Sequence, residues 1–180
     1  PFRPRSPYAV AKSTAFWEVA NYREAYGLFS CSGILFNHES PLRPDRFVTK
    51  KIVSVACRIA AGAKEKLKIG NIEVRRDWGW APEFVEGMHR ILTQEKPGDY
   101  VLATGESHSL KEFLAATFAE LGLNWEDHVE VQADFFRPLD IAESVGNPAK
   151  AKKILGWSAQ VRFKDLIKRL VEAQRNGKAG

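Results

Sequence analysis

The sequence predicts an α/β protein with a parallel sheet, and three observations support this class. Short apolar segments rich in β-forming residues alternate along the chain with longer segments of helical spacing. The segment 28–36, LFSCSGILF, is a continuous apolar run of the kind that a strand buried in a parallel sheet requires. The polar, Pro-punctuated segment 37–46 follows at once. Because ligands of open α/β sheets bind at the carboxyl ends of the strands, we expect a binding site there.

The elements follow from local signals along the chain. Ser6 and Pro7 predict the start of a helix, and Gly27 predicts its end. Ser109, with Glu112 three residues later, predicts a capping box at the start of another helix. The remaining expected elements are, in order, a strand at 28–36, a loop at 37–46, a helix at 47–62, a turn at 70–71 with short strands within 66–80, a helix at 82–94, a strand within 97–105, helix 109–123, strand 128–134, and helices 147–157 and 162–177.

Length and composition limit the classes of function. The chain has 180 residues, 44% of them hydrophobic, which suffices for a domain with its own core. Its net charge is +5, but basic and acidic residues are interleaved without an RNA- or DNA-binding motif. This pattern disfavours nucleic acid and leaves an anionic small molecule open. No apolar run reaches the roughly 20 residues that span a bilayer, and the first residues lack a signal-peptide pattern. We interpret Cys31 and Cys57 as reduced thiols of a cytoplasmic protein rather than as a disulfide.

Tyr8 stands four residues before Lys12 near the start of the first expected helix. Four residues are just over one helical turn, so both side chains leave the same face. A phenol beside an ammonium ion ionises more easily, because the opposite charge favours phenolate. The pair is therefore either an acid/base unit or two ordinary surface residues, and the spacing alone does not decide between them.

Three polar clusters are further candidates. The segment 37–43, NHESPLR, directly follows the expected strand, and we favour a binding role for it over ordinary turn chemistry. In the segment 75–78, RRDW, an arginine could bind phosphate, or it could form an ion pair beside a half-buried tryptophan. Arg137 and Asp140 could bind a diphosphate and a ribose, or form a weak surface ion pair. The sequence has no Gly-rich dinucleotide fingerprint and no Cys/His cluster for a metal.

Seven segments together resemble the GDP-mannose 4,6-dehydratase family, which belongs to the extended short-chain dehydrogenase/reductases. They are, in order, PRSPYAVAK, NYREAYGLFSCSGILFNHESP, FVTKKI, RRDWG, YVLATGE, FFRP and AKKILGW. The resemblance implies the C-terminal part of a Rossmann-type parallel sheet plus a smaller mixed α/β lobe that binds a nucleotide sugar. Residues 1–36 would end the Rossmann domain and carry the catalytic helix. Residues 37–180 would form mostly the substrate lobe, with 82–105 returning to the sheet.

The resemblance also implies a reaction, in which GDP-D-mannose becomes GDP-4-keto-6-deoxy-D-mannose through bound NADP. Hydride leaves C4, water is lost across C5 and C6, and the hydride returns to C6. In this scheme Tyr8 is the base that removes the proton of the 4-hydroxyl group. Lys12 would stabilise the phenolate and bind the nicotinamide ribose. The Y-x-x-x-K spacing would thus direct the phenol to the sugar and the ammonium to the cofactor.

The resemblance assigns binding roles to further positions. The implied cofactor contacts are Lys12, His38 and Arg43. The implied substrate contacts are Asn37, Val48, Lys51, Asn71, Arg76, Arg137 and Asp140. The chain departs from the family pattern at Trp80 and Glu83, which replace His and Asp, and at Asp140, which replaces Glu. The resemblance therefore assigns no ligand contact to Trp80 or Glu83.

The chain begins with Pro and lacks the Gly-rich loop and the Thr and Glu that the family uses for the elimination step. We read it as the C-terminal half of such an enzyme and expect it to be inactive alone. The alternatives are a related nucleotide-sugar reductase or epimerase, or a non-catalytic GDP-sugar-binding or interaction module. An incomplete sheet exposes apolar surface, which predicts a homo-oligomer, a dimer or tetramer, with helices 8–26 and 82–94 as candidate interfaces.

Overall fold

The computed structural model describes residues 3–136 and 141–177. The helices in these ranges are α1 (Pro7–Tyr26), α2 (Val48–Ala60), α3 (Ala81–Leu92), α4 (Leu110–Glu120), α5 (Ala149–Leu155) and α6 (Phe163–Arg175), with short 3-10 helices η1 (Trp125–Asp127) and η2 (Ala133–Phe135). The strands there are β1 (Ser32–Leu35), β2 (Asn37–Glu39), β3 (Leu67–Ile69), β4 (Arg75–Arg76), β5 (Trp78–Trp80), β6 (Asp99–Leu102), β7 (His108–Ser109), β8 (Val129–Val131) and β9 (Glu143–Ser144). The predicted α/β class is confirmed.

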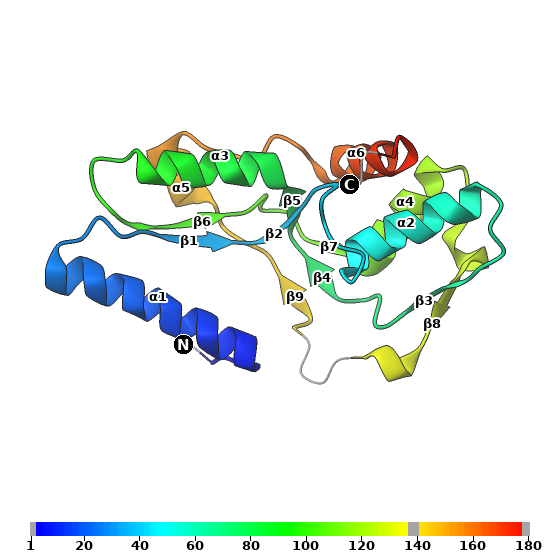
Figure 1. Ribbon diagram of the computed structural model, residues 1–180, viewed down its shortest axis with the longest axis horizontal. Coiled ribbons are helices and arrows are strands. Elements are labelled where there is room, and N and C mark those ends of the chain that lie inside the picture. Colours follow the sequence, from blue (N-terminus) through cyan, green and yellow to red (C-terminus); the bar gives the residue numbers. More distant parts are fainter. Residues whose placement is uncertain (1–2, 137–140, 178–180) are drawn as a thin grey trace.

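The first strands form a parallel array. β1 pairs with β6 and β2 pairs with β5, both in parallel. Only Phe36 separates β1 from β2, and its N–H donates to the carbonyl of Leu102 at 3.0 Å, so the two strands run almost continuously. α1 lies along one side of this array, while α3 and α5 lie on the other (Figure 1). The parallel pairing expected for the apolar segment near residue 30 is confirmed.

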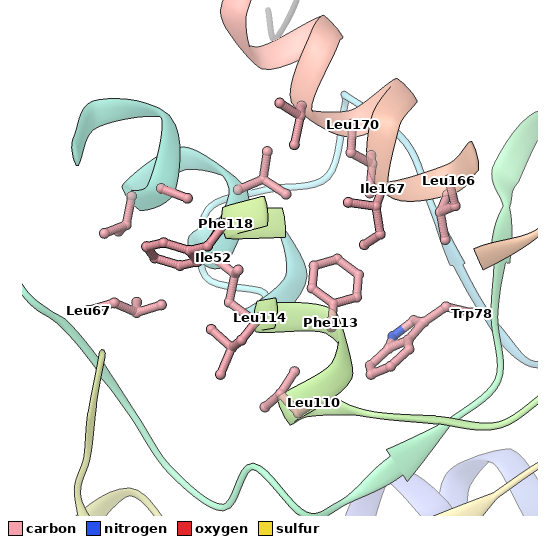
Figure 2. Packing of buried hydrophobic residues seen from close by; sticks show 14 of the residues in the cluster. Ile52, Leu67, Trp78, Leu110, Phe113, Leu114, Phe118, Leu166, Ile167 and Leu170 are labelled. Carbon is pink, nitrogen blue, oxygen red and sulfur yellow. The ribbon is translucent and has the colours of Figure 1, made fainter. Parts of the chain in front are cut away.

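Buried side chains form two cores. The sheet core lies between β1, β6, α3 and α5 and contains Phe84, Ile91, Tyr100, Leu102, Ala151, Leu155, Trp157 and Ala159. The helix core lies mainly between α2, α4 and α6 and includes the residues labelled in Figure 2, among them Ile52, Trp78, Phe113, Phe118 and Leu166. The antiparallel and parallel partners of β4, which are β7 and β9, lie between these two regions (Figure 1).

β5 connects the two cores. Trp78 packs in the helix core, with its ring centroid 5.2 Å from that of Phe113. The next residue, Gly79, faces the sheet core so closely that an added Cβ would overlap the ring of Phe84. Glycine is required here because of this close approach rather than because of its backbone angles.

The local signals placed most helix ends correctly. Ser6 caps α1 by accepting a hydrogen bond from the N–H of Ala9 at 3.1 Å, and Gly27 ends it in the left-handed conformation at φ 64°. The capping box of α4 is present, because Ser109 and Glu112 each accept a hydrogen bond from the other's backbone N–H. These predictions are confirmed.

Two expectations for the segment 28–46 were wrong. Only Ser32–Leu35 of the expected strand 28–36 is a strand, and Gly33, Ile34 and Leu35 are exposed rather than buried. Among the described residues β1 has one paired edge, so packing covers only part of it. The expected loop begins later than predicted, because Asn37–Glu39 forms β2 alongside β5.

The described residues contain neither a helix suited to cross a membrane nor a cluster suited to bind a metal ion. No helix within residues 3–136 or 141–177 combines the length and apolar character needed to cross a membrane. The same residues hold no cluster of three or more His, Cys, Asp or Glu side chains placed to bind a metal ion. Cys31 and Cys57 are not paired with each other in the structure, and both are partly buried.

Candidate active site

Tyr8 and Lys12 lie on one face at the start of α1. The ammonium nitrogen of Lys12 is 5.7 Å from the centroid of the Tyr8 ring. Tyr8 is 73% exposed, and Lys12 is exposed as well. Within the described part of the chain, neither side chain makes a hydrogen bond, ion pair or ring contact with the other candidate residues. The two side chains therefore lie next to each other, as their spacing predicts, and both are exposed to solvent.

α1 is fixed to the sheet at its opposite end. Arg23 forms two hydrogen bonds to the carboxylate of Asp99, both 2.8 Å, and donates a third to the carbonyl of Ser30 at 3.1 Å. The Arg23 hydrogen bond lowers the pKa of Asp99, as does the charge of Arg23. Ala20 is the one buried residue of α1 in the structure as described. This ion pair is therefore the main polar attachment of the helix that carries Tyr8.

β2 and the following turn hold the next candidates. Nδ1 of His38 lies 2.8 Å from the carbonyl of Phe36, and its ring stacks on Phe84 with centroids 4.9 Å apart. The guanidinium of Arg43 lies 3.9 Å from the centroid of the Phe47 ring. Asn37 pairs with Trp78 across the strands. The sequence correctly placed these polar groups at the carboxyl end of a parallel strand.

Lys51 and Asn71 lie near η2. The ammonium of Lys51 donates to the carbonyl of Lys68 at 2.7 Å and is 5.6 Å from the ring of Phe135. Asn71 accepts a hydrogen bond from the N–H of Glu73 at 2.9 Å, so its side chain stabilises the turn. An added Cβ at the neighbouring Gly70 would lie 2.6 Å from the carbonyl oxygen of Phe135, which shows how closely η2 approaches this turn.

The two arginines of β4 bind different partners. Arg75 donates to the carboxylate of Glu112 at 3.0 Å and to the carbonyl of Ser107 at 2.6 Å. Arg76 donates to the carbonyl of Ile141 at 2.6 Å, the first described residue after 137–140. Arg137 and Asp140 themselves lie outside the described residues. Val48, the remaining predicted contact, is 38% exposed at the start of α2.

Asp77 has a role that the sequence did not reveal. It is fully buried, and instead of pairing with Arg75 or Arg76 it accepts four hydrogen bonds. They come from the N–H and hydroxyl of Thr104, at 2.9 and 2.7 Å, and from the N–H groups of Gly105 and Gly146, at 3.0 and 3.3 Å. Asp77 therefore joins β5 to the loops that follow β6 and β9.

Trp80 and Glu83, two of the three departures from the family pattern, make contacts within the fold. The carboxylate of Glu83 accepts hydrogen bonds from the N–H groups of Gln160 and Val161, both 3.1 Å. The guanidinium of Arg169 lies 5.5 Å from the Trp80 ring. Both side chains thus attach the start of α3 to the segment before and within α6.

Comparison with known proteins places this arrangement in a family. The family described as GDP-mannose 4,6 dehydratase matches residues 1–170. The Arabidopsis thaliana protein GDP-mannose 4,6 dehydratase 1 is 54% identical over 172 residues, which are 96% of this chain and 48% of that protein. This chain thus spans about half the length of the curated relatives it matches.

Solved structures share the fold. The RMD protein of Pseudomonas aeruginosa, solved with NADPH, superposes with a TM-score of 0.85 at 21% identity, over 97% of this chain and 58% of that one. The UDP-glucose 4-epimerase of Thermus thermophilus, solved with NAD, gives a TM-score of 0.79 at 28% identity, over 96% and 55%. The expected Rossmann-type α/β fold is confirmed by these neighbours and by the parallel strands.

Proposed function

Because this chain belongs to the GDP-mannose 4,6-dehydratase family, we propose that it provides the acid/base pair and the nucleotide-sugar contacts for conversion of GDP-D-mannose to GDP-4-keto-6-deoxy-D-mannose. The observation that carries the proposal is the position of Lys12 beside the Tyr8 ring on the open end of α1. The two groups have the spacing that the chemistry needs, and they leave room for a substrate on their exposed side.

In this proposal Tyr8 accepts the proton of the sugar 4-hydroxyl group as phenolate. Lys12 contributes a positive charge one helical turn away, which stabilises that phenolate. Ser6 caps α1 and Pro7 is its first residue, so they fix the position of Tyr8 in the first turn. The Arg23–Asp99 ion pair holds the other end. When bound, NADP supplies a hydride acceptor and donor within one turnover.

Lys12, His38 and Arg43 are the proposed contacts to NADP. The fit rests on the chemistry of the donors: Arg43 is a fixed cation, and within residues 3–136 and 141–177 its two terminal nitrogens donate no hydrogen bond. A guanidinium with free terminal N–H groups suits an anionic oxygen. A nicotinamide cofactor also accompanies the same fold in both solved neighbours described above.

The proposed GDP-mannose contacts are Asn37, Val48, Lys51, Asn71, Arg76, Arg137 and Asp140. Lys51 supports this assignment, because it lies beside a hollow of about 410 Å³ whose lining has more cations than acids. The other charged residues of the lining are Arg58, Lys66, Lys68, Asp45 and Glu65, and Arg58 pairs with Glu65 at 2.7 Å. Arg76 supports it as well, since its hydrogen bond reaches Ile141, next in sequence to the segment that carries Arg137 and Asp140. We assign residues 1–36 to the Rossmann domain and 37–180 mostly to the substrate lobe, with 82–105 in the sheet.

We further propose that these 180 residues alone do not complete the reaction, because the relatives are about twice as long. We propose a homo-oligomer and a cytoplasmic location. Exposed aromatic residues on α1 support association, namely Trp17 at 58%, Tyr22 at 47% and Tyr26 at 68% exposure.

A hybrid enzyme tests the proposal. The matched 172 residues of the Arabidopsis thaliana relative are replaced by this chain, and GDP-mannose turnover is measured with NADP. The hybrid is expected to be active, and Tyr8→Phe should lower kcat by roughly 10²–10⁴-fold, as for loss of a general base. Tyr22→Phe is the matched control, because Tyr22 is another exposed tyrosine of α1.

Two results would count against the proposal. A hybrid that folds and binds GDP but shows no turnover would refute the assignment of dehydratase activity. Equal activity of the Tyr8→Phe and Tyr22→Phe variants would refute the role of Tyr8 as the general base. Separately, measurable turnover by the 180-residue chain alone would show that the remainder of the relatives' length is dispensable.

A further inference from the structure

Glu39 is a buried carboxylate next to a candidate cofactor residue. It lies at the end of β2 and is only 2% exposed. One of its oxygens, Oε2, accepts a hydrogen bond from the hydroxyl of Thr49 at 2.8 Å and lies 3.3 Å from Nε of Arg43. The same carboxylate therefore contacts the turn after β2 and the first turn of α2.

Burial of this carboxylate requires compensation. Desolvation raises the pKa of Glu39, while the charge of Arg43 and the Thr49 hydrogen bond act in the opposite direction. The hollow between these side chains has a volume of about 10 Å³, which is about the smallest space that holds one water. Because Glu39 is 2% exposed, its charge would be strongly unfavourable there without Arg43 as a partner.

Arg43 is held on two sides and left open at its tip. Nε is buried and lies 3.3 Å from Glu39 as an ion pair without a hydrogen bond, and the guanidinium carbon lies 3.9 Å from the Phe47 ring centroid. The backbone N–H of Arg43 also donates to the carbonyl of Ser40 at 3.1 Å. In the described ranges the terminal nitrogens of Arg43 make no hydrogen bond, and its side chain is 26% exposed.

We propose that Glu39 is a positioning residue, which holds the Arg43 guanidinium against Phe47 so that its two terminal nitrogens face an anionic oxygen of the cofactor. The inference rests on the proposed function for its ligand, and on the contacts of the described residues for its geometry. An arginine fixed in this way has already lost its rotamer freedom, so less entropy is lost on binding.

A purely structural role for Glu39 predicts something different. If Glu39 only joined β2 to α2 through Thr49, a glutamine would accept the same hydroxyl hydrogen bond, and Arg43 would be unaffected. If Glu39 positions Arg43, the loss of charge frees the guanidinium even when the Thr49 hydrogen bond remains. Glu39→Gln therefore separates the two roles, and Glu39→Asp keeps the charge.

The first experiment measures the mobility of Arg43 in the 180-residue chain. The Nε–H signal is assigned in nitrogen-15 NMR spectra with the help of Arg43→Lys, and its order parameter is measured. We expect a rigid value of about 0.85 in the unaltered chain and below about 0.6 in Glu39→Gln, with Glu39→Asp closer to the unaltered chain. An equally rigid Arg43 in Glu39→Gln overturns the proposal.

The second experiment measures NADP affinity by calorimetry in the hybrid enzyme described above. We expect Glu39→Gln and Arg43→Ala each to raise the Kd about tenfold, the equivalent of one charge-assisted hydrogen bond. Because Glu39 acts through Arg43, the double variant should bind no more weakly than Arg43→Ala alone. Additive effects of the two substitutions overturn the proposal.

The two experiments separate the failure of this inference from failure of the proposed function. If the hybrid binds NADP and Arg43→Ala does not weaken it, Arg43 is not a cofactor contact and the proposal is overturned. If the hybrid without substitutions binds no NADP, the proposed function fails. The NMR result then still decides whether Glu39 holds Arg43.

Discussion

Replacing Asp77 by asparagine should destabilise the chain although the two side chains have nearly the same shape. The carboxylate is fully buried and accepts hydrogen bonds from Thr104, Gly105 and Gly146. Asparagine has one acceptor oxygen and one donor group in place of two acceptors. In its best orientation the amide NH2 faces Thr104, whose hydroxyl can turn to accept, and only the backbone N–H of Thr104 loses its partner.

The magnitude follows from these contacts. One buried N–H left without a partner costs about 1–3 kcal/mol, and each of the two remaining hydrogen bonds weakens because its acceptor is no longer charged. Easier burial of a neutral amide offsets part of this cost. We expect a net loss of about 2–3 kcal/mol in the free energy of unfolding. For a chain of 180 residues this lowers Tm by roughly 5–10 °C.

Urea denaturation of the 180-residue chain, followed by circular dichroism, measures the loss. Thr104→Val is the matched control, because it leaves the carboxylate in place and removes the hydroxyl, which donates to Asp77 at 2.7 Å and accepts from the N–H of Glu106 at 3.1 Å. Since Glu106 is exposed and its N–H can bind water instead, the change should cost about 1 kcal/mol. If Asp77→Asn is no less stable than Thr104→Val, the carboxylate does not join the two loops and the reasoning is wrong.

Two further predictions concern acid pH. Glu112 has its pKa lowered from 4.5 to about 2, chiefly by the N–H of Ser109, so its stabilising contribution is complete above about pH 4.5 and is lost as the pH falls toward 2. Because its side chain is 46% exposed, Glu112→Gln should cost only about 1 kcal/mol at pH 7. Urea titrations should show a much smaller difference at pH 2, where Glu112 is about half protonated in the folded chain; a constant difference across that range would contradict this. Arg23 lowers the pKa of Asp99, so Asp99→Asn should speed hydrogen exchange in α1 at neutral pH and have less effect below the ordinary pKa of an aspartate; unchanged exchange would show that α1 is held by other contacts.

The parts of the fold that the sequence predicted are those fixed by neighbouring residues. Ser6 and Gly27 delimit α1, and Ser109 with Glu112 begins α4, because caps involve groups within one turn. The strand 28–36 was predicted too long and too buried, since its burial depends on what packs against it. An apolar run alone carries no information about its partners.

The site shows the same division. The sequence located Tyr8, Lys12 and the polar residues after the parallel strand, because their spacing is local. It did not find Asp77, whose hydrogen-bond partners lie 27 to 69 positions away along the chain. Glu39 was within a predicted binding segment, but its burial against Thr49 and Arg43 became visible only in the folded chain. An acidic residue in an otherwise polar segment was the only available hint.

The contact of Gly79 with Phe84 has a mechanical consequence. β5 contributes one residue to each core in succession, so the distance between the cores is set by the thickness of bare backbone. An added Cβ at position 79 would overlap the Phe84 ring, so either that ring or β5, with which β2 pairs at this point, would have to shift. A shift of β5 would carry residues 37–39 with it through their strand pairing, although none of them had been changed.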